Sequence, residues 1–349
     1  MSLRIACLLA LPATLAAQGR DYQLTGPEVA VWNVAGTLRV EGGTGDAVRV
    51  TVDRQGADAS RLKVEVGDVR GRSALRVIYP QGRVVYPEGG RGRSWGGSRA
   101  KLRVKEDGTF DGGWGGRGDE VEVVSDGRGL EAHADIRVSV PKGKLVDLHL
   151  AVGTATVTNV DGDIRVDVHS ADVTTSHTRG RLVLDTGSGE VRVTDAEGEI
   201  DLDTGSGQVT VEGVRGDHLR MDTGSGRVSA GDVRVSSLGL DTGSGSVTLR
   251  TVSARDLAVD SGSGSVELDL VDDVDRMTVE SGSGSVTIGV PASLGAELSV
   301  ETGSGGIDLG IPVTVRRAER RSLRGAIGDG RGTLRIETGS GGVRLRATR

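Results

Sequence analysis

The sequence predicts an all-β fold, a parallel β-solenoid (β-helix-like) of about ten short coils with two strands in each. The first observation behind this prediction is a motif that recurs eight times: an acidic residue, then Thr or Ser, then Gly-Ser-Gly. The second is its spacing of 18, 19, 19, 19, 20, 21 and 36 residues, which is typical of stacked repeats. The third is the alternation of polar and aliphatic residues between the motifs. The acidic residues of the motifs are Asp185, Asp203, Asp222, Asp241, Asp260, Glu280, Glu301 and Glu337.

Each repeat holds two strands and two turns. In the first full repeat, residues 190–193 alternate, a polar corner covers residues 194–198, and residues 199–202 alternate again. Alternation indicates a strand with one buried face, because successive side chains point to opposite faces. The buried positions of successive repeats, such as Val191 and Val209, are predicted to stack into aliphatic ladders inside a tube.

A single coil is too small to fold alone. Burying its aliphatic side chains contributes roughly 6–15 kcal/mol, whereas ordering each residue costs roughly 1–2 kcal/mol in backbone entropy. Neighbouring coils must therefore supply both burial and hydrogen bonds, which explains why the copies occur in series.

The motif is interpreted as the structural turn of each coil. Its carboxylate is expected to accept hydrogen bonds from backbone N–H groups of the turn, as in an Asx-turn. The two glycines allow a positive φ at the corner. The hydroxyl, as in Thr204, is expected to point inward and to bond between coils.

The chain before the regular repeat is predicted to be a less regular β region, residues 18–144, which caps the solenoid. Strands are indicated at residues 29–40, 47–53, 61–66 and 73–79. The repeat β-solenoid is assigned to residues 145–349, and its first two coils, at residues 151–157 and 167–173, are degenerate copies.

Two segments interrupt the pattern. Residues 87–118 are rich in Gly and Arg and are predicted to be a flexible insertion with a hairpin near residues 101–104. Exposed aromatic and Arg side chains often dominate binding, so this insertion is the predicted partner contact, and packing back onto the solenoid as a cap is the alternative. The predicted contact residues are Trp95, Trp114, Arg91 and Arg93. Residues 313–332 form an Arg-rich excursion, interpreted as a solvated loop, with contact to an anionic lipid or polymer as the alternative.

Residues 1–17 have the pattern of a secretory signal peptide. Arg4 supplies the positive charge, residues 5–11 a short apolar run, and Ala16 or Ala17 the small residue at the cleavage edge. We therefore expect the mature chain outside the cytoplasm, in the periplasm, at the cell surface or secreted. No other stretch is long and apolar enough for a transmembrane span.

Composition argues against several classes of function. Cys7 is the only cysteine, so the mature chain is expected to have no disulfide and no cysteine-ligated metal. The net charge of −6 argues against nucleic-acid binding. All aromatic residues lie at or before Trp114, so the rod lacks the rings on which sugars usually stack. No cofactor is expected.

Several motifs resemble functional sites, and each has a structural explanation. Asp-Thr-Gly-Ser is also the active-site string of pepsin-like proteases, but that chemistry needs two opposed aspartates, and stacked copies do not oppose each other. Calcium takes about six to eight oxygen ligands, more than one acid per coil supplies. The Arg-Gly-Asp triplets at residues 117–119 and 215–217 are expected by chance in this composition. No zinc-ligand spacing is found among His133, His149, His169, His177 and His218.

The signal peptide, the weak N-terminal coils and the repeated aliphatic-x-aliphatic-Asp-Thr-Gly-Ser-Gly-x-Val-x-Val pattern together resemble the bacterial putative-adhesin family of uncharacterised β-solenoid domains. The ending, residues 325–330 followed by residues 334–343, also looks like that family. The resemblance covers residues 30–349, with the Gly/Arg-rich insertion as an unusual feature. It implies an envelope or surface location and no established catalytic residues.

The sequence thus predicts a non-enzymatic, extracytoplasmic and adhesin-like interaction module of the cell envelope or surface, whose partner is an unidentified protein or polymer. One alternative is a carbohydrate-active enzyme, a polysaccharide lyase or hydrolase on a β-helix, which would need acids, Lys, Arg and aromatics clustered on one face. A second alternative is a calcium-stabilised structural rod.

Overall fold

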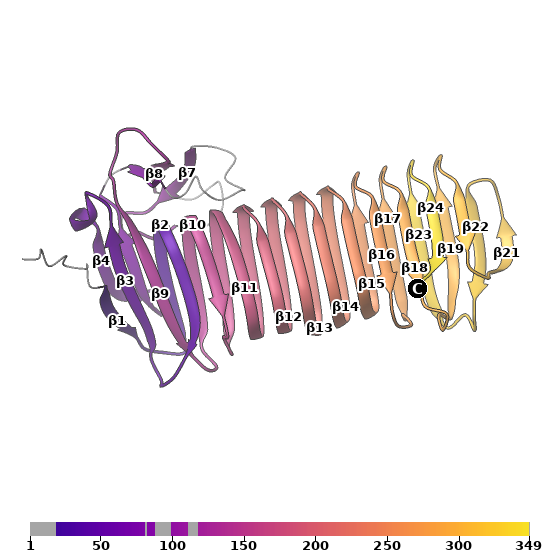
Figure 1. Ribbon diagram of the computed structural model, residues 1–349, viewed down its shortest axis with the longest axis horizontal. Helices are drawn as coiled ribbons and strands as arrows, with labels where there is room; N and C mark the ends of the chain where they lie inside the picture. The colour runs from indigo at the N-terminus through magenta and orange to yellow at the C-terminus, as the bar shows by residue number, and fades with distance from the viewer. Residues whose placement is uncertain (1–18, 81, 88–98, 111–117, 349) are drawn as a thin grey trace, which may run out of the picture.

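The computed structural model describes residues 19–80, 82–87, 99–110 and 118–348, which form one long rod (Figure 1). A sheet of 21 strands winds along the rod, and a separate sheet of three strands lies beside one end. Successive coils pair in parallel, so the predicted all-β solenoid is confirmed. The described residues contain no α-helix, and η1 (Ala59–Arg61) is a 3-10 helix of one turn.

The regular part of the rod consists of long parallel strands. Each strand pairs with the next at an offset of 18 or 19 residues, so that Asp203 lies beside Asp222 and Asp222 beside Asp241. Equal positions of the repeat are therefore neighbours, as the alternation predicts. The strands are β10 (Leu145–Thr158), β11 (Asp163–Ser188), β12 (Val191–Ser206), β13 (Val209–Ser225), β14 (Val228–Ser244) and β15 (Val247–Ser261).

Beyond β15 each coil is split into two shorter strands, and chain order no longer matches spatial order. The strands here are β16 (Val266–Leu270), β17 (Arg276–Ser281), β18 (Val286–Val290), β19 (Ala296–Thr302), β20 (Ile307–Gly310), β23 (Gly332–Thr338) and β24 (Val343–Ala347). β23 pairs with β17 on one edge and β19 on the other, and β24 lies likewise between β18 and β20. The last coil of the chain is therefore inserted between two earlier coils, and residues 314–327, which precede it in the chain, lengthen the spacing before Glu337 to 36 residues.

The far end of the rod is covered by a hairpin of β21 (Thr314–Ala318) and β22 (Ser322–Ile327). β22 pairs antiparallel with β19, on the edge that the parallel coils leave open. β21 pairs with β22 and is exposed along its whole length. Arg316 anchors the hairpin by a two-pronged ion pair with Glu297. The Arg-rich excursion thus contains a cap that keeps the next coil position occupied.

The N-terminal end is a less regular cap. Its strands are β1 (Arg20–Leu24), β2 (Glu28–Gly43), β3 (Val48–Gln55), β4 (Lys63–Val69), β5 (Arg72–Ile78) and β9 (His133–Pro141). β2 pairs in parallel with β10 along its length, so it is the first coil of the rod. The other edge of β2 is shared by β5 and β9, and antiparallel strands continue outward from both. The strands predicted in this region are all present.

The separate sheet comes from the Gly/Arg-rich part of the chain and its flanks. It consists of β6 (Arg83–Val85), β7 (Arg99–Val104) and β8 (Asp119–Val124), with β8 in the middle. β6 runs parallel to β8 and β7 antiparallel to it. Figure 1 shows this sheet against the outer side of the rod, beside β2 and β10.

The interior of the rod is a continuous set of aliphatic ladders. Val191, Val209 and Val228 are in register, and each is at most 1% exposed. The glycines of the motif have a steric cause, because a Cβ on Gly207 would lie 1.9 Å from the carbonyl oxygen of Gly189 in the neighbouring coil. The coils approach too closely at this corner for any side chain.

Candidate functional site

One patch on the outside of the rod is apolar. Trp32 and Val34 of β2 and Val152 of β10 are buried beneath the three-stranded sheet. Phe110 and Val123 from the other side complete a second apolar cluster, which is distinct from the interior ladders. β2 is therefore buried on both faces, and the small sheet is docked on the first two coils.

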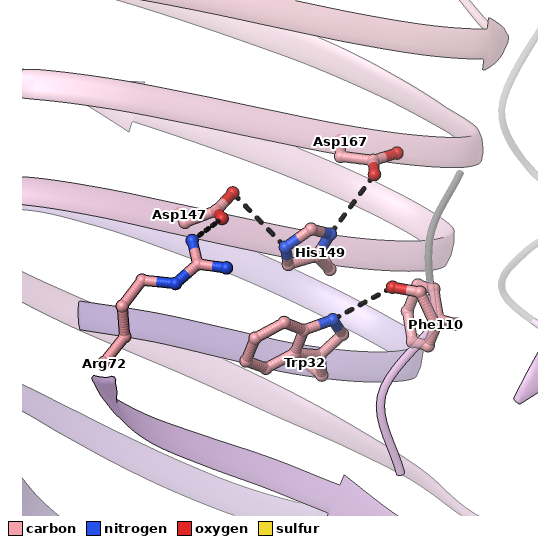
Figure 2. A network of polar contacts seen from close by, with 6 residues as sticks. All are labelled: Trp32, Arg72, Phe110, Asp147, His149 and Asp167. Atoms are coloured by element: carbon pink, nitrogen blue, oxygen red, sulfur yellow. Dashed lines mark hydrogen bonds and ion pairs between the residues drawn. The ribbon is translucent and has the colours of Figure 1, made fainter. Parts of the chain in front are cut away.

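A network of charged side chains lies in this region (Figure 2). The His149 ring stacks on Trp32, with ring centroids 4.6 Å apart and planes 3° from parallel. Its Nδ1 lies 3.2 Å from Oδ2 of Asp167, and its Nε2 lies 3.2 Å from Oδ1 of Asp147. Arg72 pairs with the other oxygen of Asp147. The network joins β2, β5, β10 and β11.

The same two rings hold the segment that precedes β8. The indole Nε1 of Trp32 donates a hydrogen bond to the carbonyl oxygen of Phe110 at 3.0 Å. The Phe110 ring meets the His149 ring edge-on, with centroids 6.2 Å apart. These contacts connect the buried ion network directly to the docked part of the chain.

The pKa values of His149 and Asp147 are both shifted toward the charged form. Burial alone would lower the pKa of His149, but Asp147 and Asp167 raise it to about 9. Burial would likewise raise the pKa of Asp147, but His149 and Arg72 hold it below its usual range. Two cations therefore balance two anions. Since desolvation offsets much of the attraction in buried ion pairs, the main effect of this arrangement is on geometry.

A neutral hydrogen-bond cluster lies beside the network. The hydroxyl of Tyr79 is 2.9 Å from both Oδ1 of Asn33 and the carbonyl oxygen of Ala35. Nδ2 of Asn33 donates to the carbonyl oxygens of Ala35 and Ala134 at 3.0 and 2.7 Å. Burial raises the pKa of Tyr79, so its hydroxyl stays protonated. The cluster ties the chain after β5 to β2 and β9.

The motif acids form a single column along the outside of the rod. In spatial order the column runs Asp185, Asp203, Asp222, Asp241, Asp260, Glu280, Glu337 and Glu301. Asp167 extends it toward the N-terminal end, and His149 is the partner of Asp167 in the next coil. The column therefore ends in the buried ion network, whose imidazolium faces the last carboxylate.

Burial and mutual repulsion raise the pKa of several column carboxylates. Burial, together with the charges of Asp167 and Asp203, raises the pKa of Asp185 to about 6. Burial and Asp222 also raise the pKa values of Asp203 and Asp241. These side chains are neighbours along one edge of the rod and do not face each other across a cleft. The geometry therefore lacks the opposed pair that a pepsin-like mechanism requires.

The carboxylates do not cap the turns, so the predicted Asx-turns are wrong. In the corners from residue 261 onward it is the next residue's hydroxyl that does so, as Oγ of Ser281 accepts a hydrogen bond from the Gly284 N–H at 3.0 Å. The hydroxyl lies one residue closer to the turn and inside the tube, where it reaches this N–H. Thr204 points inward as predicted and is fully buried, but its hydroxyl has no hydrogen-bond partner.

A groove of about 750 Å³ runs beside the column near the C-terminal end. Its charged lining residues are Asp260, Glu280, Glu301, Glu337, Glu319 and Arg321. Within the described ranges, no group of three or more His, Cys, Asp or Glu side chains could hold a metal ion. The groove is thus acidic, and its geometry indicates no particular ligand.

The predicted contact residues Trp95, Trp114, Arg91 and Arg93 lie outside the described residues, and their role stays a prediction. Residues 88–98 end at β7, and residues 111–117 lie between Phe110 and the start of β8.

The sequence interpretation missed the buried ion network, although part of it had a signal. Asp147 and His149 alternate with the buried Leu148 and Leu150, so they face outward. Asp167 follows His149 by 18 residues, the period of the first repeats. Extending that period one coil upstream would have paired them. No sequence period connects Trp32 or Arg72 to the network, because both lie on strands of the irregular N-terminal cap.

The family model described as Toastrack DUF4097 matches residues 129–346. Among curated proteins, none matches this chain. One solved structure, described as a putative cell adhesion protein from Clostridium sporogenes ATCC 15579, is similar over 95% of this chain and 100% of that chain. The sequence identity is 9% and the TM-score is 0.23, too low to support an argument about function. In the part of the chain that the structure describes, no helix has the length and apolar character needed to cross a membrane.

Proposed function

We propose that this chain, which belongs to the Toastrack DUF4097 family, is a non-enzymatic interaction module that acts outside the cytoplasm, in the cell envelope or at the cell surface. In this proposal the solenoid is a stiff carrier. The three-stranded sheet docked on its side, together with residues 88–98 and 111–117, which adjoin it in the sequence, is the contact region. The partner is an envelope or surface protein or polymer.

The observation that supports this function most directly is the docking of the small sheet on the outer face of the first coils. Stacked coils bury their own apolar side chains inside the tube, so a solenoid needs no cover on its outer surface. Here Trp32 and Val34 nevertheless face outward and are covered by the sheet. The His149 network fixes the orientation, because a displaced sheet would uncover buried charges.

A contact region held in one orientation binds with less loss of conformational entropy than a free loop does. Aromatic and Arg side chains contribute most to binding at interfaces. We therefore propose that Trp95, Trp114, Arg91 and Arg93 make the partner contacts. A signal peptide over residues 1–17 would bring the chain to the envelope.

The competing function is that of a carbohydrate-active enzyme. Such enzymes place two carboxyl groups on either side of the scissile bond, whereas the column acids lie in one row along an edge. The chain also has no Phe, Trp or Tyr after Trp114, so no ring is available beside the column to stack on a sugar. Both features favour the interaction module.

The test compares capture of isolated envelope proteins and polymers by the mature chain and its variants. Trp95→Ala/Trp114→Ala removes the two proposed aromatic contacts, and a second variant replaces residues 88–98 with a Gly-Ser linker. Arg250→Gln/Arg255→Gln is the matched control, because both side chains are exposed on β15 and have no side-chain partner in the described chain. We expect a defined partner to be captured by the wild type and the control and lost from the first two variants.

Two results would overturn the proposal. One is capture that is equal for all variants, because the contact region would then be irrelevant. The other is turnover of a polysaccharide by the purified chain that disappears when a single column acid, such as Asp185, is replaced by Asn. That result would assign the carbohydrate-active alternative.

A further inference from the structure

The N-terminal cap carries a hollow of about 510 Å³ that shares no residue with the cluster beneath the small sheet. Four strands of the cap, β1, β2, β3 and β9, contribute its walls. Its volume falls within the roughly 300–1,000 Å³ of small-molecule sites in proteins. The polar residues that line it are Asp21, Gln23, Arg39, Glu41, Arg49, Thr51, Arg137 and Ser139.

Three arginines converge on this hollow from three different strands. Arg39 of β2 lies directly beside Arg137 of β9 in the parallel register. Arg49 of β3 is paired with Ser139, two residues further along β9. Among the described residues, none of the three has a hydrogen bond or ion pair from its side chain, unlike Arg316, which is held by Glu297.

The hollow carries three guanidinium groups against two carboxylates, Asp21 and Glu41, so its net charge is positive. Like charges on adjacent strands repel each other and destabilise the sheet. Elsewhere on the rod most arginines lie within reach of an Asp or Glu in the same coil or the next, as Arg181 pairs with Asp201. The unpaired guanidinium groups in the hollow are therefore free to bind an anion. Guanidinium groups bind carboxylate or phosphate in a two-pronged geometry.

The remaining lining residues indicate a ligand that also carries hydroxyl groups. Asp21 accepts a hydrogen bond from Oγ1 of Thr51 at 2.7 Å and keeps a second oxygen that is open to a further donor. Glu41 supplies another acceptor, while Gln23 and Ser139 both donate and accept. Sugar hydroxyls donate and accept in the same way, so this set of side chains suits a sugar that also carries an acidic group.

The rest of the rod limits the length of the ligand. The chain has a net charge of −6, and the acid column lines much of one edge. A long polyanion lying along the rod would meet mostly carboxylates, whereas a compact anion in the hollow would meet three arginines against two carboxylates, Asp21 and Glu41. We propose that the hollow of the N-terminal cap binds a short anionic saccharide, one or two sugar units with a carboxylate or phosphate group. This site is independent of the proposed contact region.

Calorimetric titration of the mature chain tests the proposal with four probes. They are a disaccharide that contains a uronic acid, a sugar phosphate, an uncharged disaccharide and inorganic phosphate. We expect the uronate or the sugar phosphate to bind at least roughly tenfold more tightly than the uncharged disaccharide, which lacks the charged hydrogen bonds, and than phosphate, which lacks the sugar hydroxyls. The first two probes distinguish carboxylate from phosphate, and either supports the site. Binding should weaken as salt is raised, because the charges are exposed.

Variants then localise the binding. Arg39→Gln/Arg137→Gln is expected to lower the affinity for the preferred ligand by roughly tenfold or more. Arg49→Gln tests the same hollow from another strand, should the double variant fail to fold. Arg250→Gln is the matched control, because Arg250 is exposed on β15, lies outside the hollow and has no side-chain partner in the described chain. The Arg250→Gln variant should bind the preferred ligand with the same affinity as the wild type.

The proposal is wrong if none of the four probes binds, or if the uncharged disaccharide or phosphate alone binds as tightly as the charged saccharides. It is also wrong if Arg39→Gln/Arg137→Gln and Arg49→Gln both leave the affinity unchanged, or if Arg250→Gln lowers it equally. These outcomes do not depend on residues 87–118, so they are distinct from failure of the interaction module.

Discussion

The two halves of the rod use the same five-residue motif to build different corners. From β12 to β14 a single strand covers each coil as far as the Ser of the next motif, and successive coils are 18 or 19 residues apart. From β16 onward each coil is split into two strands, and the spacing grows to 20 and 21 residues. The added residues lie opposite the motif, at residues 271–275 and 291–295, outside the strands.

The hydroxyl of the motif responds to this change. Thr204 in the first half is buried without a hydrogen-bond partner. In the second half Oγ1 of Thr338 accepts from the Gly341 N–H at 3.1 Å and donates to the carbonyl oxygen of Gly284 at 3.1 Å. Both residues are Thr, so residue type does not cause the difference. The hydrogen bonding of the corner therefore follows the position of the coil along the rod and not the type of the motif hydroxyl residue.

The largest expected effect comes from removing a coil, and it should differ sharply between the halves. Deletion of residues 209–227 removes one complete coil and leaves neighbours that carry equal positions, so we expect a shorter rod that folds cooperatively. Deletion of residues 332–349 removes the inserted coil, with its four buried aliphatic side chains and roughly 6–12 kcal/mol of burial. We expect the second deletion to unfold the C-terminal end, because β19 loses its parallel partner.

Limited proteolysis with mass spectrometry, together with thermal melts, distinguishes the two deletions. New cleavage sites between residues 296 and 327 are expected after the C-terminal deletion and not after the internal one. If the C-terminal deletion stayed protected there, the last coil would not be an interior coil of the rod.

The difference between the halves also shows where sequence interpretation works. The ladders can be predicted from periodicity. Val191 and Val209 occupy the same position of the repeat, so they have equivalent neighbours in any order of the coils. The insertion of the last coil does not follow from it, because Val343 fits equally well beside Val286 or beside Ile307. Identical repeats define the shape of a coil and leave the order of coils undetermined.

The buried ion network and the docked sheet were hard to predict for a different reason. Trp32, Arg72 and His149 are far apart in the sequence and meet through the irregular cap, so no spacing connects them. The hollow on the cap has the same origin, since Arg39 and Arg137 are neighbours only through the pairing of β2 with β9. Both candidate sites thus lie where the repeat fails.

The next effect in size concerns the close approach of the coils. At Gly207, φ is +142° and a Cβ would lie 1.9 Å from a backbone carbonyl oxygen. We expect Gly207→Ala to lower the free energy of unfolding by roughly 2–4 kcal/mol, because the backbone has to move. Gly239→Ala is the control, since a Cβ there meets nothing within 4 Å. Chemical denaturation measures both, and an equal cost at the two positions would contradict the steric explanation.

Replacing the motif threonine by valine should change the free energy of unfolding by a smaller amount and in opposite directions in the two halves. Thr204→Val removes a buried hydroxyl that has no partner, so we expect no loss of stability or a gain of up to roughly 1 kcal/mol. Thr338→Val leaves the Gly341 N–H and the Gly284 carbonyl oxygen without their partner and should cost roughly 1–3 kcal/mol. The difference between the two free energies of unfolding is the measurement. Equal values would mean that both corners have the same hydrogen bonding.

The smallest effect comes from the carboxylate column. The pKa of Asp185 is about 6 in the folded chain, above its ordinary 3.8, because of burial and the charges of Asp167 and Asp203. The folded state therefore binds a proton at Asp185 more tightly than the unfolded state does. This proton binding contributes fully to the free energy of unfolding below about pH 4, and the contribution is lost as the pH rises through about 6. We expect Asp185→Asn to raise the melting temperature at pH 7 by roughly 1–3 °C. The melting temperature of the wild type should increase from pH 7 toward pH 5, and this increase should be smaller in the variant. Glu337→Gln should give no such gain, because Arg335 pairs with Glu337. A variant at Asp185 that followed the wild type at every pH would show that repulsion along the column has no influence on stability.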